Sequence, residues 1–414
     1  MRPGDVLDLV WPGRGVEPPS APEPADGTGP VPPRRPSRSL RGCLDIEDLR
    51  RLARRALPRP IFDYVDGGAD DELTLAANRR AFAERRFAPR VLRDVSAPDL
   101  SCRLFGRDLS APVGLAPTGY TRIVHPDGEP AAAGAAAALG LPYTLSTMAT
   151  TSIEDLAATG VRERWFQLYV WRDRARTESL IDRAAEAGYR VLVVAVDTPV
   201  AGMRRRDARN GLVIPPRPTA GALAGIARRP GYWIRLLRSP AITFANLTGS
   251  PGDSVESISS MFDPAFGWRD LAAIRSRWPG PLMIKGPLSP EDARQATDVG
   301  VDGVYLSNHG GRQLDRCATP LDLLPGVRAA VGARFTVIVD SGIRHGADVA
   351  VALALGADAA FVGRPYLYGL AAAGQAGAEH ALRLLTGQLR RTMQLLGVAT
   401  LDALRAEGAG LLIR

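Results

Sequence analysis

The chain has 414 residues, of which 45% are hydrophobic and 23% charged, and these values exclude wholesale disorder. Its three widely spaced cysteines exclude a disulfide framework and a zinc cluster, so no metal site is expected, and an aromatic content of 6% argues against a base-stacking surface. The net charge of +8 is concentrated in residues 201–240, which hold nine arginines and one aspartate; a nucleic-acid binder would spread its charge along a groove, so no nucleic-acid partner is expected.

The N-terminal part of the sequence predicts a leader followed by helices. Residues 1–40 contain ten prolines and little periodic apolar pattern, so we expect a disordered, proline-rich leader. Residues 41–110 are expected to form a helical segment that packs on the main domain, because apolar residues recur at helical spacing from Ile46 to Leu52 and the acids at 70–72 suit a further helix start. Without a secretory signal or an apolar run of ~18–20 residues, the sequence predicts a cytoplasmic protein.

Residues 111–405 alternate between eight short apolar runs and eight alanine-rich stretches with helical spacing. The runs are 112–116, 141–145, 164–169, 190–196, 282–284, 303–306, 335–339 and 359–362. Several are continuously apolar, as parallel strands buried on both faces are. The pattern predicts an α/β fold of the (β/α)8 TIM-barrel type with an N-terminal helical extension. A doubly wound sheet is the second choice, because it usually has fewer strands and a glycine fingerprint after the first.

A long insert, residues 200–268, separates the fourth and fifth expected strands and carries most of the excess positive charge. Its segment 212–247 combines arginines with apolar and aromatic residues. Such a segment could lie on the inner face of an anionic membrane, where each basic residue contributes roughly 1 kcal/mol. A lid or an oligomer contact with a solvated basic rim is the alternative. Arg205 and Arg206 are expected to be solvated.

Polar residues follow every expected strand, at the end of a TIM barrel where the chemistry takes place. In chain order they are Pro117 and Thr118; Ser146; Gln167 and Tyr169; Asp197 and Thr198; Lys285; Ser307, Asn308 and His309; Asp340, Ser341 and Gly342; Gly363 and Arg364. Any one of them could merely cap a helix, but together they indicate a site. Lys285 is the only lysine among 52 basic residues; it is either a chance survivor or a compact charge that arginine cannot replace.

The last two strand ends predict a phosphate site. Gly342 to Arg344 and Gly363 with Arg364 offer unshielded backbone N–H groups, two arginines and a helix N-terminus. Simple turn glycines are the alternative.

Three motifs carry a family resemblance. Ser307 to Asp315 (SNHGGRQLD), Lys285 with Gly286, and Asp340 to Arg344 (DSGIR) resemble the FMN-dependent α-hydroxy acid oxidase and dehydrogenase family. That family includes glycolate oxidase, L-lactate dehydrogenase and mandelate dehydrogenase, and the likeness runs from about Asp45 to Arg405.

The resemblance implies oxidation of an L-2-hydroxy acid to the 2-oxo acid. His309 matches the catalytic base, Asp197 the carboxylate that orients it, and Arg204 and Arg312 the clamp on the substrate carboxylate. The implied catalytic residues are His309, Asp197, Tyr169 and Tyr64, and the implied substrate-binding residues are Arg312, Arg204, Tyr64, Tyr169, Met148 and Gly119.

The resemblance also implies FMN as the cofactor. The implied cofactor-binding residues are Pro117, Thr118, Gly119, Ser146, Gln167, Lys285, Ser307, Asp340, Gly342, Arg344, Gly363 and Arg364. Lys285 matches the lysine at the N1/C2 edge of the flavin, where it stabilises negative charge.

Three positions depart from the family pattern. Ala195 replaces a threonine found in many members, Gly119 an alanine usual in oxidases, and Met148 a tryptophan that narrows the pocket of glycolate oxidase. The two smaller or more flexible side chains in the pocket favour a substrate larger than glycolate, resembling lactate or mandelate.

Two other functions compete with this interpretation: an FMN- or phosphate-binding isomerase or aldolase that uses Lys285, and a catalytically silent flavin-binding scaffold. The trio of His309, Arg312 and Arg204 argues against both, because a carboxylate clamp beside a base serves neither. The sequence does not decide whether oxygen or a quinone is the electron acceptor. Members of the family commonly form tetramers, so the resemblance implies a homotetramer.

Overall fold

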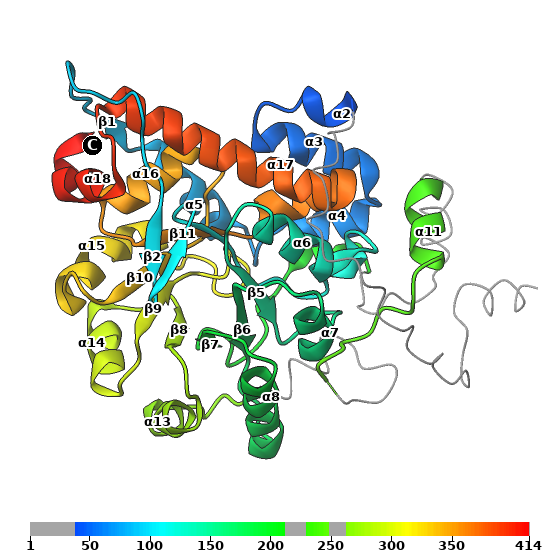
Figure 1. Ribbon diagram of the computed structural model, residues 1–414. Helices are drawn as coiled ribbons and strands as arrows, with labels where there is room; N and C mark the ends of the chain where they lie inside the picture. The colour runs from blue at the N-terminus through cyan, green and yellow to red at the C-terminus, as the bar shows by residue number, and fades with distance from the viewer. Residues whose placement is uncertain (1–37, 212–228, 248–261, 414) are drawn as a thin grey trace, which may run out of the picture.

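The computed structural model describes residues 38–211, 229–247 and 262–413, and its centre is a closed barrel of eight parallel strands (Figure 1). The strand order around the barrel is β10-β11-β4-β5-β6-β7-β8-β9. The strands are β4 (Val113–Leu115), β5 (Tyr143–Ser146), β6 (Arg164–Leu168), β7 (Leu192–Ala195), β8 (Leu282–Gly286), β9 (Gly303–Leu306), β10 (Thr336–Val339) and β11 (Ala359–Val362). All eight overlap the predicted runs, so the predicted TIM barrel is confirmed.

Helices surround the barrel, and most begin at a side chain that caps them. They are α6 (Gly128–Ala137), α7 (Ile153–Ala158), α8 (Arg174–Glu186), α13 (Trp268–Arg277), α14 (Pro290–Asp298), α15 (Pro320–Val331), α16 (Gly346–Ala354) and α17 (Arg364–Leu396). Ser152, Ser289 and Thr319 each accept a hydrogen bond from the backbone N–H three residues on, which satisfies a donor that the helix leaves free.

α17 is not one continuous helix, although the helical spacing of its alanine-rich sequence runs over residues 366–396. α17 breaks at Ala373 and Gly374, where Gly374 has φ +59°, a backbone angle that favours glycine. The two halves touch closely, because a Cβ added to Gly369 would lie 2.2 Å from the carbonyl oxygen of Gly377.

The interior of the barrel is filled by side chains. Trp165, Met283, Tyr305 and Phe361 are buried there with smaller apolar residues, in one cluster that includes Leu104. Leu104 belongs to a hairpin formed by β2 (Cys102–Leu104) and β3 (Arg107–Leu109). The hairpin packs against the interior side chains, so a binding site has to lie at the other end, where the strands terminate.

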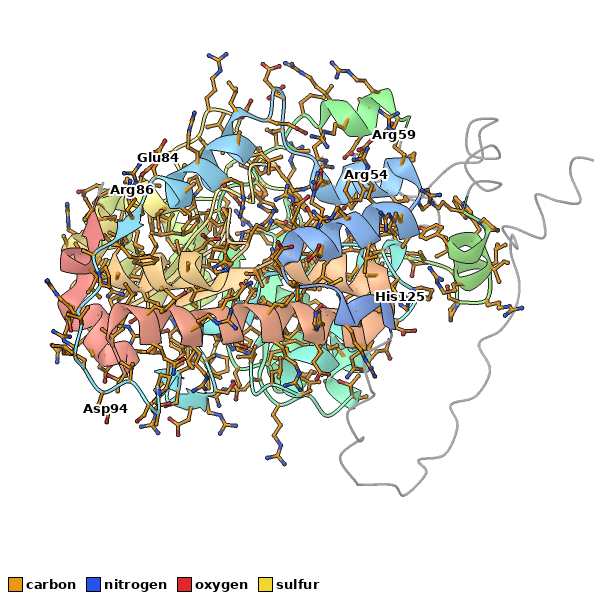
Figure 2. All side chains as sticks on the ribbon, turned by 90° about the horizontal axis from the view of Figure 1, so that it is seen from above. Arg54, Arg59, Glu84, Arg86, Asp94 and His125 are labelled. Carbon is orange, nitrogen blue, oxygen red and sulfur yellow. The ribbon has the colours of Figure 1, made fainter. Side chains whose placement is uncertain are left out.

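The N-terminal extension is helical only as far as Ala83. Its helices are α2 (Arg38–Arg41), α3 (Ile46–Ala56), α4 (Arg59–Asp66) and α5 (Leu73–Ala83), and α3 lies along α17, as Figures 1 and 2 show. The helical segment predicted for 41–110 is therefore too long: β1 (Arg86–Phe87) follows and pairs with the C-terminal β12 (Leu412–Ile413), beyond α18 (Leu401–Glu407) and η2 (Gly408–Leu411). Pro89 and Pro98, which disfavour a helix interior, explain the change.

Charged side chains cover the outside of these elements. Figure 2 shows Arg54, Arg59, Glu84 and Arg86 at the surface, and all four are exposed. The apolar side chains of α3 at Ile46 and Leu49 are buried beneath them.

The insert is described in part. It begins with α9 (Arg205–Arg209) and contains α11 (Pro230–Leu237), which projects from the side of the barrel (Figure 1). Residues 212–228 and 248–261 of the insert, and residues 1–37 of the predicted leader, lie outside the described residues. In the described ranges, no helix is both long and apolar enough to cross a membrane.

Candidate functional site

A cavity opens at the C-terminal ends of the barrel strands and brings together most of the predicted site. The predicted residues that line it are Tyr64, Pro117, Thr118, Gly119, Met148, Tyr169, Arg204, Lys285, His309, Arg312, Asp340, Gly342, Arg344, Gly363 and Arg364. The other four lie behind the lining. Asp197 and Ser307 are hydrogen-bonded to His309, and Gln167 is hydrogen-bonded to Ser146, which accepts from the Met148 N–H.

His309 stands just beyond β9 in a left-handed backbone conformation, with φ +58°. Few residues other than glycine adopt this angle, and such strain is typical of functional sites. Its Nδ1 lies 3.1 Å from Asp197 Oδ2, and its Nε2 lies 3.1 Å from the Tyr169 hydroxyl. The ring is thus held at both nitrogens, with a carboxylate on one side and a phenol on the other.

Burial and charge set the protonation of both partners of His309. Burial of Asp197, whose side chain is 4% exposed, opposes ionisation, but the neighbouring His309 outweighs it and the pKa of Asp197 lies below its usual value. Burial, reinforced by Asp197, raises the pKa of Tyr169. Asp197 therefore stays anionic and Tyr169 keeps its proton, so Asp197 can stabilise a protonated His309 while Tyr169 offers a hydrogen bond.

Two arginines lie over the ring of Tyr64. The guanidinium carbons of Arg312 and Arg204 lie 5.0 and 5.9 Å from the centre of its ring. Burial and the nearby Arg204 lower the pKa of Arg312, which makes no ion pair with any carboxylate among the described residues. An anion brought between the two guanidinium groups would relieve their repulsion, so the pair can bind a carboxylate.

Lys285 is the last residue but one of β8 and is linked to His309 through the hydroxyl group of Ser307. Its Nζ donates to Ser307 Oγ at 2.8 Å, and the same Oγ accepts the backbone N–H of His309 at 3.0 Å. The ammonium also lies 3.7 Å from Asp340 Oδ2, and both side chains are less than a tenth exposed. The lone lysine and the histidine therefore line one cavity.

Gln167 presents a buried polar group without a partner. Its Oε1 accepts from Ser146, but its Nε2 makes no hydrogen bond with any part of the chain that the structure describes. A buried donor left unpaired is costly, and the polar edge of a bound flavin ring would supply the acceptor it lacks. This amide, beside a cavity lined by a buried ammonium, fits FMN.

Some of the donors expected at the predicted phosphate site face the cavity. Gly342 has φ +95°, and an added Cβ would lie 2.3 Å from Asn78 O, so only glycine fits there. The half-buried Arg344 and the first turn of α17 leave donors for an anion at this end of the cavity. The side chain of Arg364, one of the two arginines expected at the phosphate, makes other contacts.

The guanidinium of Arg364 donates to three backbone carbonyls, those of Val65, Gly67 and Gly310. Its burial lowers its pKa to about 10. This arginine ties the N-terminal extension to the barrel, and its backbone N–H is the group that stays available at the start of α17.

Several residues of the site were missed by sequence reasoning. Phe244 and Phe262 of the insert line the cavity, and the Phe262 ring stacks on Tyr169 with ring centres 4.8 Å apart. Tyr120 also lines it and packs on Phe244. No regular spacing in the insert marks which of its residues fold over the barrel.

The prediction that Arg205 and Arg206 are solvated is wrong, because both form ion pairs. Arg205 pairs with Asp71, and Arg206 pairs with Glu72 and with Asp66. Acids of the N-terminal extension, far away in sequence, neutralise both.

Comparison with known proteins agrees with this geometry. Residues 53–409 match the family described as FMN-dependent dehydrogenase. A provisionally named L-lactate dehydrogenase of Mycobacterium tuberculosis is 48% identical over 89% of this chain and 89% of its own. An L-lactate dehydrogenase of Caulobacter vibrioides is 44% identical over 85% of this chain and 93% of its own.

Among solved structures, that of the monotopic membrane protein (S)-mandelate dehydrogenase superposes with a TM-score of 0.85 at 37% identity and covers 90% of this chain and 99% of that one. A match over most of the chain, at these identities, shows the family. The chain belongs to the FMN-dependent dehydrogenase family.

Proposed function

We propose that this cavity oxidises an L-2-hydroxy acid to the 2-oxo acid. The observation that carries the proposal is His309, held between Asp197 and Tyr169 in the same cavity as Arg204 and Arg312. FMN, when bound, supplies the acceptor for the two electrons.

The side chains divide the work. Arg204 and Arg312 bind the substrate carboxylate and orient the 2-carbon. His309 Nε2 takes a proton from the substrate, and the anionic Asp197 stabilises the imidazolium that results. Tyr169 donates a hydrogen bond toward the oxygen of the reacting carbon. Lys285 places positive charge where electron density accumulates.

The lining of the cavity supports a substrate larger than glycolate. Met148 and Gly119 are in contact, because a Cβ added to Gly119 would lie 2.8 Å from Met148 Cβ. Phe244 and Phe262 add apolar surface from the insert. An aryl or branched side chain on the 2-carbon would be buried against these residues, and apolar burial favours its binding.

Anaerobic titration of the purified yellow protein tests the proposal. We expect L-mandelate and L-lactate to bleach the flavin absorbance and glycolate to do so much more slowly. No bleaching by any 2-hydroxy acid would contradict the proposed activity, and equal rates with glycolate and mandelate would contradict the proposed substrate size.

Peripheral contact with a membrane forms a second part of the proposal. On α11, Ile234 and Leu237 are about half exposed, and Arg235 and Arg238 beside them are exposed too. Tyr232 anchors the helix by donating to Ile123 O at 2.7 Å. Apolar residues flanked by arginines favour an anionic bilayer surface.

Flotation with anionic liposomes at physiological salt tests this contact. We expect the protein to float, and the double variant Ile234→Asp/Leu237→Asp to stay at the bottom while keeping its activity. Wild-type protein that fails to float would favour a cytoplasmic enzyme. A quinone is the electron acceptor that we expect at a membrane, and rapid reoxidation of the flavin in air would favour oxygen instead.

The predicted homotetramer can be checked by sedimentation.

A further inference from the structure

The turn that follows α4, residues 66–72, holds one of the two arginines proposed to bind the substrate. Arg312 Nη1 donates to Tyr64 O at 2.6 Å and to Gly67 O at 3.0 Å. Arg364 donates to Gly67 O as well, at 2.7 Å. Because these carbonyls fix the guanidinium of Arg312, its position depends on where the 66–72 turn lies.

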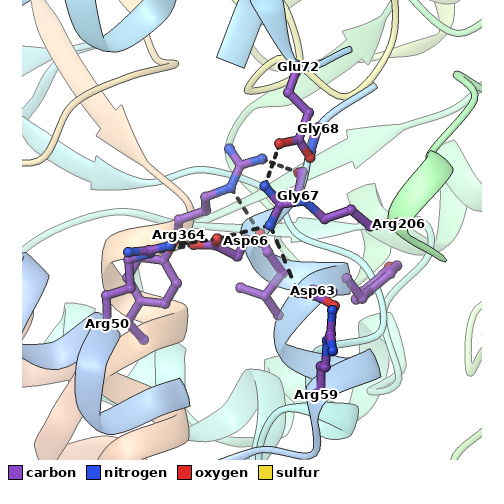
Figure 3. Close-up of polar contacts among 12 residues, drawn as sticks. Arg50, Arg59, Asp63, Asp66, Gly67, Gly68, Glu72, Arg206 and Arg364 are labelled. Atoms are coloured by element: carbon purple, nitrogen blue, oxygen red, sulfur yellow. Dashed lines mark hydrogen bonds and ion pairs between the residues drawn. The ribbon is translucent and has the colours of Figure 1, made fainter. Parts of the chain in front are cut away.

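One side of the turn is anchored in the N-terminal extension. Arg50 donates two hydrogen bonds to Asp66, of 2.6 and 2.8 Å (Figure 3). The Tyr368 hydroxyl donates to the same carboxylate at 2.7 Å. Burial opposes ionisation of Asp66, yet these hydrogen bonds outweigh it and the pKa of Asp66 falls to about 2. The anchor is therefore charged at neutral pH.

The other side of the turn is held by Arg206 of α9. Its Nη1 lies 3.3 Å from Asp66 Oδ2, and its Nη2 donates to Glu72, as Figure 3 shows. Glu72 in turn accepts the Gly68 N–H at 2.9 Å. The stem of Arg206 packs on the turn, because a Cβ added to Gly67 would lie 3.2 Å from Arg206 Cδ. Arg206 therefore spans the whole turn, from its first residue to its last.

α9 carries the second clamp residue. Arg204 is the N-cap of α9, two residues before Arg206, and its guanidinium lies over the ring of Tyr64, as does that of Arg312. One further backbone bond, from Asp70 N–H to Met203 O at 2.8 Å, joins the two segments. The contact between α9 and the 66–72 turn therefore determines how Arg204 lies relative to Arg312.

We propose that Arg206 is a positioning residue that locks α9 to the 66–72 turn and so fixes the spacing of the Arg204 and Arg312 guanidinium groups. The inference rests on the proposed role of those two arginines as the carboxylate clamp. None of the contacts of Arg206 reaches His309 or Lys285, so we expect its loss to weaken carboxylate binding more than proton transfer.

The test compares Arg206→Gln with Arg209→Gln, a change at an exposed position of the same helix. Two ligands are used: an unreactive aryl carboxylate that competes with the substrate, and the neutral amide of the same acid. For Arg206→Gln we expect the KM for the 2-hydroxy acid and the Kd of the carboxylate to rise about tenfold, with kcat within about twofold and the Kd of the amide unchanged. Arg209→Gln should match the wild type, and Arg206→Lys, a point charge without the fork, should recover the loss only in part.

Three results would overturn the positioning role: an unchanged KM, an equal loss for acid and amide, or full recovery with lysine. Arg312→Met separates this from a failure of the clamp itself. If Arg312→Met still binds the carboxylate better than the amide, the proposed carboxylate clamp is wrong. If Arg312→Met loses this preference and Arg206→Gln keeps it, only the proposed positioning role of Arg206 is wrong. Should Arg206→Gln bind little flavin, Glu72→Gln removes the charge of the same contact from the other side and gives the same test.

Discussion

At the scale of single residues, Ser307 fixes the position of Lys285, expected beside the flavin, relative to His309, the proposed base. One oxygen accepts from the Lys285 ammonium and from the His309 backbone. A guanidinium in place of Lys285 would be broader than this crowded, buried position allows. This geometry explains why a chain so rich in arginine has a lysine at position 285.

Replacing His309 by asparagine should abolish proton transfer without disturbing the carboxylate clamp. We expect kcat to fall by about 10²–10⁴-fold, the range for loss of a general base, while the Kd of a carboxylate inhibitor changes little. Anaerobic stopped-flow reduction of the flavin measures the first, and flavin titration with the inhibitor the second. A fall of less than tenfold in kcat would assign the base to another residue.

Replacing Gly119 by alanine should discriminate against large substrates. The new Cβ would meet Met148 Cβ at 2.8 Å and Met148 O at 3.2 Å, so Met148 has to move into the cavity. We expect the KM for an aryl acid to rise about tenfold and that for lactate to change little. Adding Met148→Gly, which removes the Cβ that the new methyl group meets, should restore binding of the aryl acid. A uniform effect on both substrates would argue against this account of the pocket.

At the scale of elements, the turn after α4 is where the N-terminal extension meets the barrel and the insert. Asp66 joins α3, through Arg50, to α17, through Tyr368, while α9 approaches from the far side (Figure 3). Three elements distant in sequence thus converge on one buried carboxylate. Their packing depends on its charge.

The stability of this junction should depend on pH in a defined direction. The pKa of Asp66 is lowered from 3.8 to about 2, so its ionised form stabilises the fold above pH 3.8, and this contribution disappears as the pH falls toward 2. Asp66→Asn should cost about 2 kcal/mol in urea unfolding at pH 7, and progressively less between pH 4 and pH 3.

The matched control for that measurement is Asp108→Asn, on a surface pair where the aspartate is 82% exposed. We expect no measurable change there, because exposed ion pairs contribute little. A loss for Asp66→Asn that stays constant down to pH 3 would show that the amide disturbs packing and not charge.

At the scale of the whole molecule, the barrel was predictable because its signals are local. Several strands are short, continuously apolar runs such as Leu192 to Ala195, and polar residues lie at or just beyond the strand ends. Closing eight parallel strands into a barrel places their ends around one opening. The convergence of residues from Thr118 to Arg364 can therefore be predicted without knowing their individual contacts.

The features that the sequence did not reveal depend on contacts across long distances. Arg206 and Glu72 are 134 residues apart, and nothing in their local spacing couples them. Phe262 stacks on Tyr169, but no periodic spacing of apolar residues in the insert marks Phe262 as a residue of the site. The break in α17 at Gly374 follows from packing of its two halves, which alanine-rich spacing does not predict.

A crystal structure of the FMN-loaded protein with a bound 2-oxo acid tests the central claim most directly. Our account predicts the product carboxylate between Arg204 and Arg312, its keto oxygen within hydrogen-bond distance of His309 and Tyr169, and the flavin edge against Lys285. A carboxylate bound away from both arginines, or a flavin that leaves Lys285 and Gln167 without contact, would contradict it.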